Sequence, residues 1–194
     1  MQNLDKNRFA LLNSDLVEEA SNQVHIVETK KDGEADLTLL LSAASILFGK
    51  MDDNSWAYFE NKKCADYLLL EQYAGRYRMH IFELKRSISE KTWDSMKLQF
   101  QGGLQHSLAL AGVLGISLEL SEVQLYSVYR NDKINDSANP ARTRLQMYEG
   151  NGKTNRQTDW NHEKIKLEFP GVQKLSHHKV KLDIETGTAV YQIA

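Results

Sequence analysis

The sequence predicts an α/β domain built on a mixed β-sheet flanked by helices. Two apolar, strand-like runs, 64–71 and 77–85, are separated by the turn-like sequence "AGR". From Ser89 to about 112–115, apolar residues recur every three or four positions, which indicates one long helix. A β-rich run over 116–130 follows, and a helix between neighbouring strands usually makes a parallel crossover. The order strand, strand, helix, strand therefore predicts a mixed sheet.

The first 60 residues are predicted to add a few further elements. The apolar spacing over 8–20 suits a short helix, and residues 24–29 and 57–60 suit short strands. The longest apolar stretch, "LTLLLSAASILFG" at 37–49, is too short to cross a bilayer. We expect it to form a buried helix, with Asp36 as its N-cap.

The C-terminal part is predicted to be a β-rich extension. A polar segment over 131–161 is longer than compact domains normally tolerate, so it is either functional or mobile. Strands are expected near 164–169 and 179–193. The chain, residues 1–194, is thus predicted to be a single domain with its core at roughly 36–130.

Composition limits the class of protein further. The 194 residues are 41% hydrophobic and 26% charged, which fits one globular domain with a sizeable core. The net charge is −2, with the acidic excess in the first 60 residues, so a polyanion would meet the middle and C-terminal parts. The lone Cys64 excludes an internal disulfide, and the N-terminus has no signal-peptide pattern. We expect a cytoplasmic protein with no membrane partner.

The hairpin carries three charges that require an explanation. If Ala74 and Gly75 form the turn, antiparallel pairing places Asp66 directly opposite Glu83, and Lys85 lies on the same face because strand side chains alternate. Two opposed carboxylates are destabilising unless a positive charge lies between them. A divalent cation such as Mg²⁺ accepts a few carboxylates and keeps several waters. In the alternative interpretation, these are solvated surface charges that demand no function.

At these residues the chain resembles a nuclease superfamily. "CADYLLL", "HIFELKRS" and the following glutamine-rich helix are similar to the PD-(D/E)XK nucleases, which have the restriction-endonuclease-like fold. The resemblance implies that Asp66 and Glu83 bind the metal, that the carbonyl of Leu84 is a further ligand, and that Lys85 is the catalytic lysine. Ala65 stands where the superfamily motif has proline.

Further residues are candidates for the same site. Gln101 and Gln105 lie one turn apart on the helix, and with Arg86 they are candidates for contacts to water or phosphate. Gly102 and Gly103 are expected to let the helix backbone pack closely on the sheet. Many members of the superfamily carry another carboxylate before the Asp strand, and four glutamates remain open for it, namely Glu18, Glu19, Glu34 and Glu60.

Other chemical signals are weaker. "GNGKTN" at 150–155 lacks the first glycine of a phosphate-binding loop. The same polar segment has four cations and two aromatic rings, which suit nucleic-acid contact as well as they suit a solvated loop. His177 and His178 would point to opposite faces of a strand, so a zinc site is not expected. The basic and aromatic residues of the segment are Arg142, Arg144, Lys153, Arg156, Tyr148 and Trp160.

The sequence and the resemblance together predict a nuclease that hydrolyses phosphodiester bonds with Mg²⁺ or Mn²⁺. DNA is the expected substrate, and a homodimer or a protein partner is compatible with it. One alternative is a catalytically inactive protein of nuclease fold that binds nucleic acid or a partner, as in a phage or defence system. The other is a structural protein whose Glu83 pairs with Lys85 or Arg86 at the surface.

Overall fold

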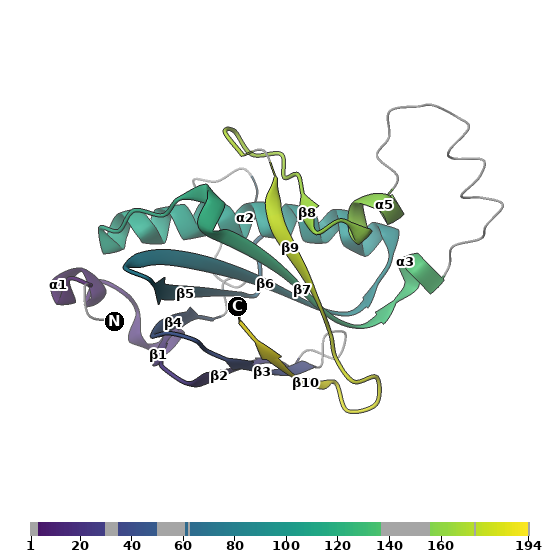
Figure 1. Cartoon of the computed structure of the whole chain (residues 1–194), viewed down its shortest axis with the longest axis horizontal. Coiled ribbons are helices and arrows are strands. Elements are labelled where there is room, and N and C mark those ends of the chain that lie inside the picture. Colours follow the sequence, from purple (N-terminus) through teal and green to yellow (C-terminus); the bar gives the residue numbers. More distant parts are fainter. Residues whose placement is uncertain are drawn as a thin grey trace.

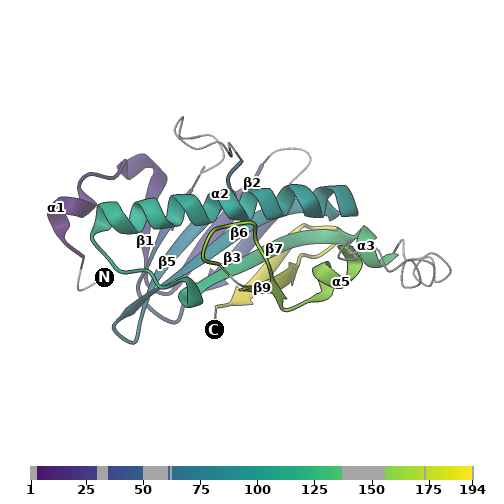
Figure 2. The same ribbon diagram turned by 90° about the horizontal axis from the view of Figure 1, so that it is seen from above.

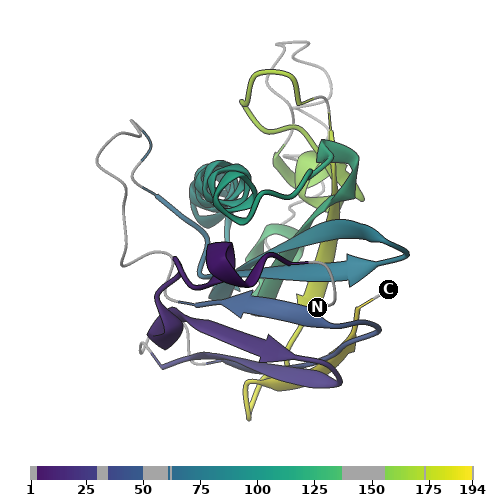
Figure 3. The same cartoon turned by 90° about the vertical axis from the view of Figure 1, so that its left-hand side faces the viewer.

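The computed structural model of the chain has three layers. It describes residues 4–29, 35–49, 61, 63–136, 156–172 and 174–193. A long helix, α2 (Glu90–Leu114), lies on one face of a seven-stranded sheet, and a three-stranded sheet lies under the other face. Figure 3 shows these layers end-on, with α2 above the larger sheet. The α/β class and the mixed sheet predicted from the sequence are confirmed.

The larger sheet is mixed, with strand order β1-β4-β5-β6-β7-β9-β8. Pairing is antiparallel from β1 to β6 and at the β8–β9 edge, whereas β6, β7 and β9 are parallel to one another. Because α2 connects β6 to β7, it forms the expected parallel crossover. The strands are β1 (Val17–Ala20), β4 (Ser45–Phe48), β5 (Tyr67–Tyr73), β6 (Arg76–Ile88), β7 (Val123–Asp132), β8 (Lys164–Ile165) and β9 (Leu175–Lys181).

Helix α2 begins and ends where the sequence predicts. The side chain of Ser89 caps its N-terminus by accepting a hydrogen bond from the Thr92 amide, and Gly115 ends it in a left-handed conformation. Its buried residues, among them Trp93, Phe100 and Leu104, pack on the sheet to form one hydrophobic core. Figure 2 shows from above that α2 extends along this face of the sheet.

The apolar stretch 37–49 forms two strands, so the buried helix predicted there is wrong. β3 (Ala35–Leu40) alternates between buried and more exposed positions, and Asp36 lies on its outer side rather than at a helix cap. β4 is buried on both faces, with Ile46 toward α2 and Leu47 toward the smaller sheet. A strand covered on both faces is apolar throughout, so its composition alone does not distinguish it from a buried helix.

The smaller sheet has the order β10-β3-β2 and encloses a second core against the larger sheet. β2 (Gln23–Glu28) pairs antiparallel with β3, whereas β10 (Thr188–Gln192) pairs with it in parallel. Figure 1 shows β9 leaving the upper layer and leading through a turn into β10. The C-terminal extension thus contributes to both sheets, through β9 in one and β10 in the other.

The remaining elements are short. Residues 8–20 are not one helix, because α1 (Lys6–Phe9) is followed by a 3₁₀ turn at Ser14–Leu16 and then by β1. Within the polar segment, α3 (Lys133–Asp136) and α5 (Arg156–Asn161) are described. A 3₁₀ turn at Leu120–Glu122 lies before that segment and leads into β7. The strand expected at 57–60 and residues 137–155 of the polar segment lie outside the described residues. No described helix is both long and apolar enough to cross a membrane.

Candidate functional site: two carboxylates and a lysine

The β5–β6 hairpin has the register that the sequence predicts. Its ladder pairs Tyr67 with Phe82 and closes at Tyr73 and Arg76, so Asp66, the next residue outward, lies opposite Glu83. Ala74 and Gly75 form the turn with φ of 48° and 78°. Two positive φ values are typical of the tight hairpin turn that matches the twist of the strands. The turn therefore determines which charged residues face one another across the strands.

Asp66, Glu83 and Lys85 lie together at the end of the hairpin away from this turn. Oδ2 of Asp66 accepts a hydrogen bond from the backbone amide of Leu84 at 2.7 Å. Lys85 Nζ forms an ion pair with Oε1 of Glu83. Both carboxylates are buried, with residue exposures of 6% for Asp66 and 0% for Glu83, whereas the Lys85 side chain is 27% exposed. The surface-charge alternative does not fit this burial.

The charges around Lys85 outweigh the effect of its burial. Burial lowers the pKa of Lys85, but the negative charges of Glu83, Asp66 and then Glu28 raise it above its ordinary value. Glu28 is the last residue of β2, and its neighbour Val27 accepts a 2.7 Å hydrogen bond from the hydroxyl of Tyr67, which follows Asp66. The smaller sheet thus brings another carboxylate close enough to act on Lys85.

The segment that carries Asp66 is packed directly on α2. A Cβ atom at Gly102 would lie 1.7 Å from the carbonyl oxygen of Lys63, and one at Gly103 would lie 2.7 Å from Cγ2 of Ile81. The expected role of the two glycines, close backbone packing, is therefore confirmed. Gln99 Nε2 also donates a hydrogen bond to the Cys64 carbonyl at 3.5 Å. Contacts with α2 thus position the chain immediately before Asp66.

The other predicted site residues lie on α2 and on the opposite face of β6. Gln101 and Gln105 are half-buried on α2, and Oε1 of Gln105 is buried without a hydrogen-bond partner among the described residues. Arg86 is exposed and lies on the face of β6 opposite to Glu83, because side chains alternate along a strand. Its expected role beside Lys85 is not supported by this orientation.

The four glutamates proposed as a further carboxylate do not include the one that acts on Lys85. Glu18 and Glu19 are exposed in β1, where they pair with Leu47 and Ile46, and Glu34 and Glu60 lie outside the described residues. Sequence reasoning missed Glu28. The signal that could have found it is its position two residues beyond the buried Ile26, which turns it toward the larger sheet.

The site offers carboxylate oxygens, which are the donor atoms that a hard divalent cation requires, although only two carboxylates supply them. Asp66 and Glu83 each use one oxygen in a contact to Leu84 or Lys85, and each has a second oxygen. Within the described part of the chain, no group of three or more His, Cys, Asp or Glu side chains is placed to hold a metal. Mg²⁺ tolerates such a site because it binds through one or two carboxylates and keeps several waters.

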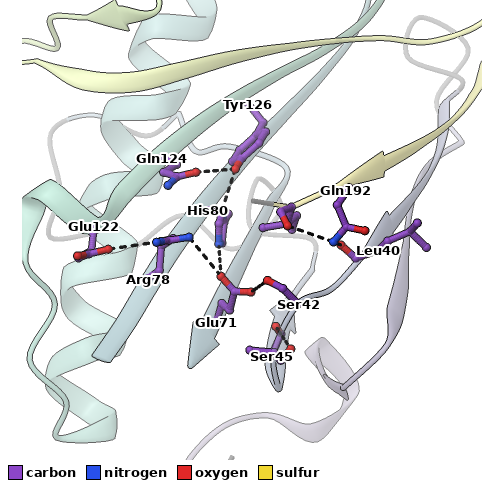
Figure 4. A network of polar contacts seen from close by, with 12 residues as sticks. Leu40, Ser42, Ser45, Glu71, Arg78, His80, Glu122, Gln124, Tyr126 and Gln192 are labelled. Atoms are coloured by element: carbon purple, nitrogen blue, oxygen red, sulfur yellow. Dashed lines mark hydrogen bonds and ion pairs between the residues drawn. The ribbon is translucent and has the colours of Figure 1, made fainter. Parts of the chain in front are cut away.

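A second polar cluster lies on the other face of the same hairpin, between the two sheets (Figure 4). Oε2 of the fully buried Glu71 lies 3.2 Å from His80 Nε2 and 3.8 Å from Arg78 NH1, and its Oε1 accepts a 2.8 Å hydrogen bond from Ser42. His80 Nδ1 is 3.0 Å from the Tyr126 hydroxyl. The cluster ties β5, β6 and β7 to the loop between β3 and β4.

The surroundings of this cluster indicate a structural role. Burial raises the pKa of Glu71, but hydrogen bonds from His80 and Ser42 and the charges of His80 and Arg78 lower it more, so the net shift is downward. Burial also lowers the pKa of His80, and Glu71 reverses only part of this effect. Toward the hairpin turn, Arg78 contacts Glu122 beside a pocket of about 340 Å³. The cluster thus supplies counter-charges for a carboxylate that would otherwise destabilise the core.

Sequence reasoning missed this second cluster, although the hairpin register contains a signal for it. The pairing that opposes Asp66 and Glu83 also opposes Glu71 and Arg78.

Comparison with known proteins adds no family or relative, because no family model, no curated protein and no solved structure matches the chain. The function is therefore argued from the geometry of the site.

Proposed function

We propose that the protein is a metal-dependent nuclease of the PD-(D/E)XK type that hydrolyses phosphodiester bonds, with DNA as the expected substrate. The observation that carries the proposal is the hairpin register, which sets Asp66 opposite Glu83 and puts Lys85 in contact with Glu83. The sheet followed by α2 also fits the restriction-endonuclease-like fold, in which an Asp on one strand and a Glu-x-Lys on the next form the metal site.

Each residue has a role that its contacts support. Asp66 and Glu83 would hold Mg²⁺ or Mn²⁺, with the Leu84 carbonyl and water as further ligands. Such a metal would lower the pKa of its bound water and would offset charge on the phosphate. The Leu84 amide orients the Asp66 carboxylate, and the Lys85 ammonium is placed to contact the attacking water or a phosphate oxygen.

The first test is cleavage of supercoiled plasmid and linear duplex with Mg²⁺, Mn²⁺ or EDTA. We expect metal-dependent cutting by the wild type, and its loss in Asp66→Asn and in Lys85→Ala. Glu168→Gln is the matched control, because Glu168 is an exposed carboxylate outside the site. A wild type that cuts no substrate with either metal, or variants that cut as well as it does, would contradict the proposal.

Metal binding can be measured separately from activity. Removal of Lys85 leaves the Glu83 carboxylate buried without its ion-pair partner, and breaking a buried pair typically costs about 3–5 kcal/mol. A divalent cation would replace the lost positive charge. We therefore expect Mg²⁺ to raise the Tm of Lys85→Ala more than that of the wild type, and not to raise the Tm of Asp66→Asn.

The catalytically inactive alternative remains distinguishable by these two experiments. The Glu83–Lys85 ion pair favours it, because an ammonium can neutralise the buried carboxylates without any metal. On that alternative, neither Mg²⁺ nor Mn²⁺ shifts the Tm of the wild type or the variants, and no substrate is cut. Binding of nucleic acid without cleavage would then be its signature.

A further inference from the structure

A row of side chains leads from the carboxylates across the sheet to two lysines. Glu83 on β6 is in register with Ser127 on β7, which is in register with Lys179 on β9. The next row outward joins Lys85, through Tyr129, to Lys181. Neighbouring strands are about 4.8 Å apart, so the lysine backbone lies roughly 10 Å from that of Glu83 and Lys85.

Both lysines face the same side of the sheet as the proposed metal site. Val180 and Leu182, which alternate with them, belong to the core between the two sheets. His177, two residues before Lys179, packs against the Trp93 ring of α2 with centroids 5.2 Å apart. Since side chains alternate along a strand, Lys179 and Lys181 point to the α2 side.

The two ammonium groups are available for an anion. Both lysines are exposed, and within the described part of the chain neither forms an ion pair with a carboxylate. Lys179 Nζ lies 5.3 Å from the centroid of the Trp160 ring and donates a 3.2 Å hydrogen bond to Asn161 Oδ1. These contacts hold the Lys179 side chain in place while its charge stays unneutralised.

The neighbouring strand leaves this part of β9 uncovered. β8 pairs only with Leu175 and Ser176, so the stretch with the two lysines is the outer strand of the sheet among the described residues. Lysines on an edge strand also protect a sheet from pairing with another chain, and this role requires no ligand. The two roles differ in their dependence on salt, because only phosphate contacts release counterions on binding.

We propose that Lys179 and Lys181 bind phosphates of the DNA strand that flank the reacting phosphate. The inference rests on the proposed nuclease function and adds the direction in which the strand leaves the site, from Glu83 across β7 toward β9. Spacing along a strand separates alternate side chains by about 6.5 Å, so the two lysines can each contact a different phosphate.

The test is equilibrium binding of a fluorescein-labelled duplex oligonucleotide, measured by anisotropy in EDTA over a range of salt concentrations. For Lys179→Gln/Lys181→Gln we expect roughly tenfold weaker binding, and a slope of log K against log salt that is smaller by about two. Lys179→Arg/Lys181→Arg should keep the wild-type slope, because it keeps both charges. Lys6→Gln on α1 is the control for loss of one exposed charge elsewhere.

The outcomes separate this inference from the proposed function. An unchanged slope in the double Gln variant overturns the inference even if the wild type cuts DNA, and self-association of that variant would then indicate edge protection. A reduced slope together with a wild type that never cuts DNA supports phosphate binding by the two lysines, whereas it overturns the nuclease function and, with it, the position beside a reacting phosphate. A wild type that does not bind the duplex at all overturns it.

Discussion

Substitution of glycine by alanine is expected to have opposite effects on stability at two positions of α2. Gly102 packs on the backbone before Asp66, where an added Cβ would lie 1.7 Å from the Lys63 oxygen and 2.8 Å from its carbonyl carbon. Gly112, ten residues along the helix, has nothing within 4 Å of that position. Because both lie within the same helix, Ala gains similar helix propensity at each, and the difference isolates the contact with the sheet.

The magnitudes follow from these distances. Replacing Gly by Ala within a helix stabilises by up to about 1 kcal/mol, so Gly112→Ala should raise the free energy of unfolding by about that amount. At Gly102 the helix and the Lys63 segment must separate by more than an ångström, since ordinary contacts begin at 3.4 Å. Overpacking of this kind costs roughly 1–3 kcal/mol, which exceeds the gain in propensity.

Urea unfolding of the two variants and the wild type measures this difference, provided that the m-value is unchanged. Because the gain in helix propensity cancels, we expect Gly102→Ala to be less stable than Gly112→Ala by the cost of overpacking, roughly 1–3 kcal/mol. Because the displaced segment leads into Asp66, Gly102→Ala should also weaken the rise in Tm produced by Mg²⁺. Equal stability of the two variants would refute the close packing of α2 on this segment.

Two further predictions concern pH and the hairpin turn. Burial lowers the pKa of His177 to about 4, against 6.5 in the unfolded chain, so the unfolded state binds a proton first as the pH falls. Stability should therefore drop by about 3 kcal/mol between these two pH values and not above them. Urea unfolding of His177→Asn over the same window should show a shallower decline, and parallel profiles for variant and wild type would contradict the assignment. Ala74 has a φ of 48°, a conformation that Asn tolerates better than Ala. Ala74→Asn should therefore raise the free energy of unfolding of the protein by roughly 0.5–1 kcal/mol. A Tm for Ala74→Asn at or below that of the wild type would show that the turn is not strained.

The hairpin and the helix could be predicted from the sequence because their determinants are local. The turn at Ala74 and Gly75, together with the alternation of side chains, is sufficient to oppose Asp66 and Glu83. The three- and four-residue spacing and the cap residue Ser89 are sufficient to define α2. In each case the interacting residues are close in sequence, so few competing arrangements exist.

The layered arrangement could not be predicted in the same way, because it depends on contacts between distant residues. β10 pairs in parallel with β3, so Ala189 meets Leu37 across most of the chain length. That smaller sheet buries the second face of the larger one, which is why 37–49 forms strands rather than the expected helix. Local apolar composition is the same for a strand covered on both faces and for a buried helix.

The proposed site also has some features that depend on local sequence and others that depend on contacts between distant residues. The sequence by itself determined which carboxylates face each other and that Lys85 joins them, since register and alternation are properties of one hairpin. Only the tertiary structure decided that both carboxylates are buried and that Glu28 approaches from another sheet. It also decided that Lys179 continues the row, because β9 reaches β7 only through long-range pairing, whose register depends on the packing of both cores.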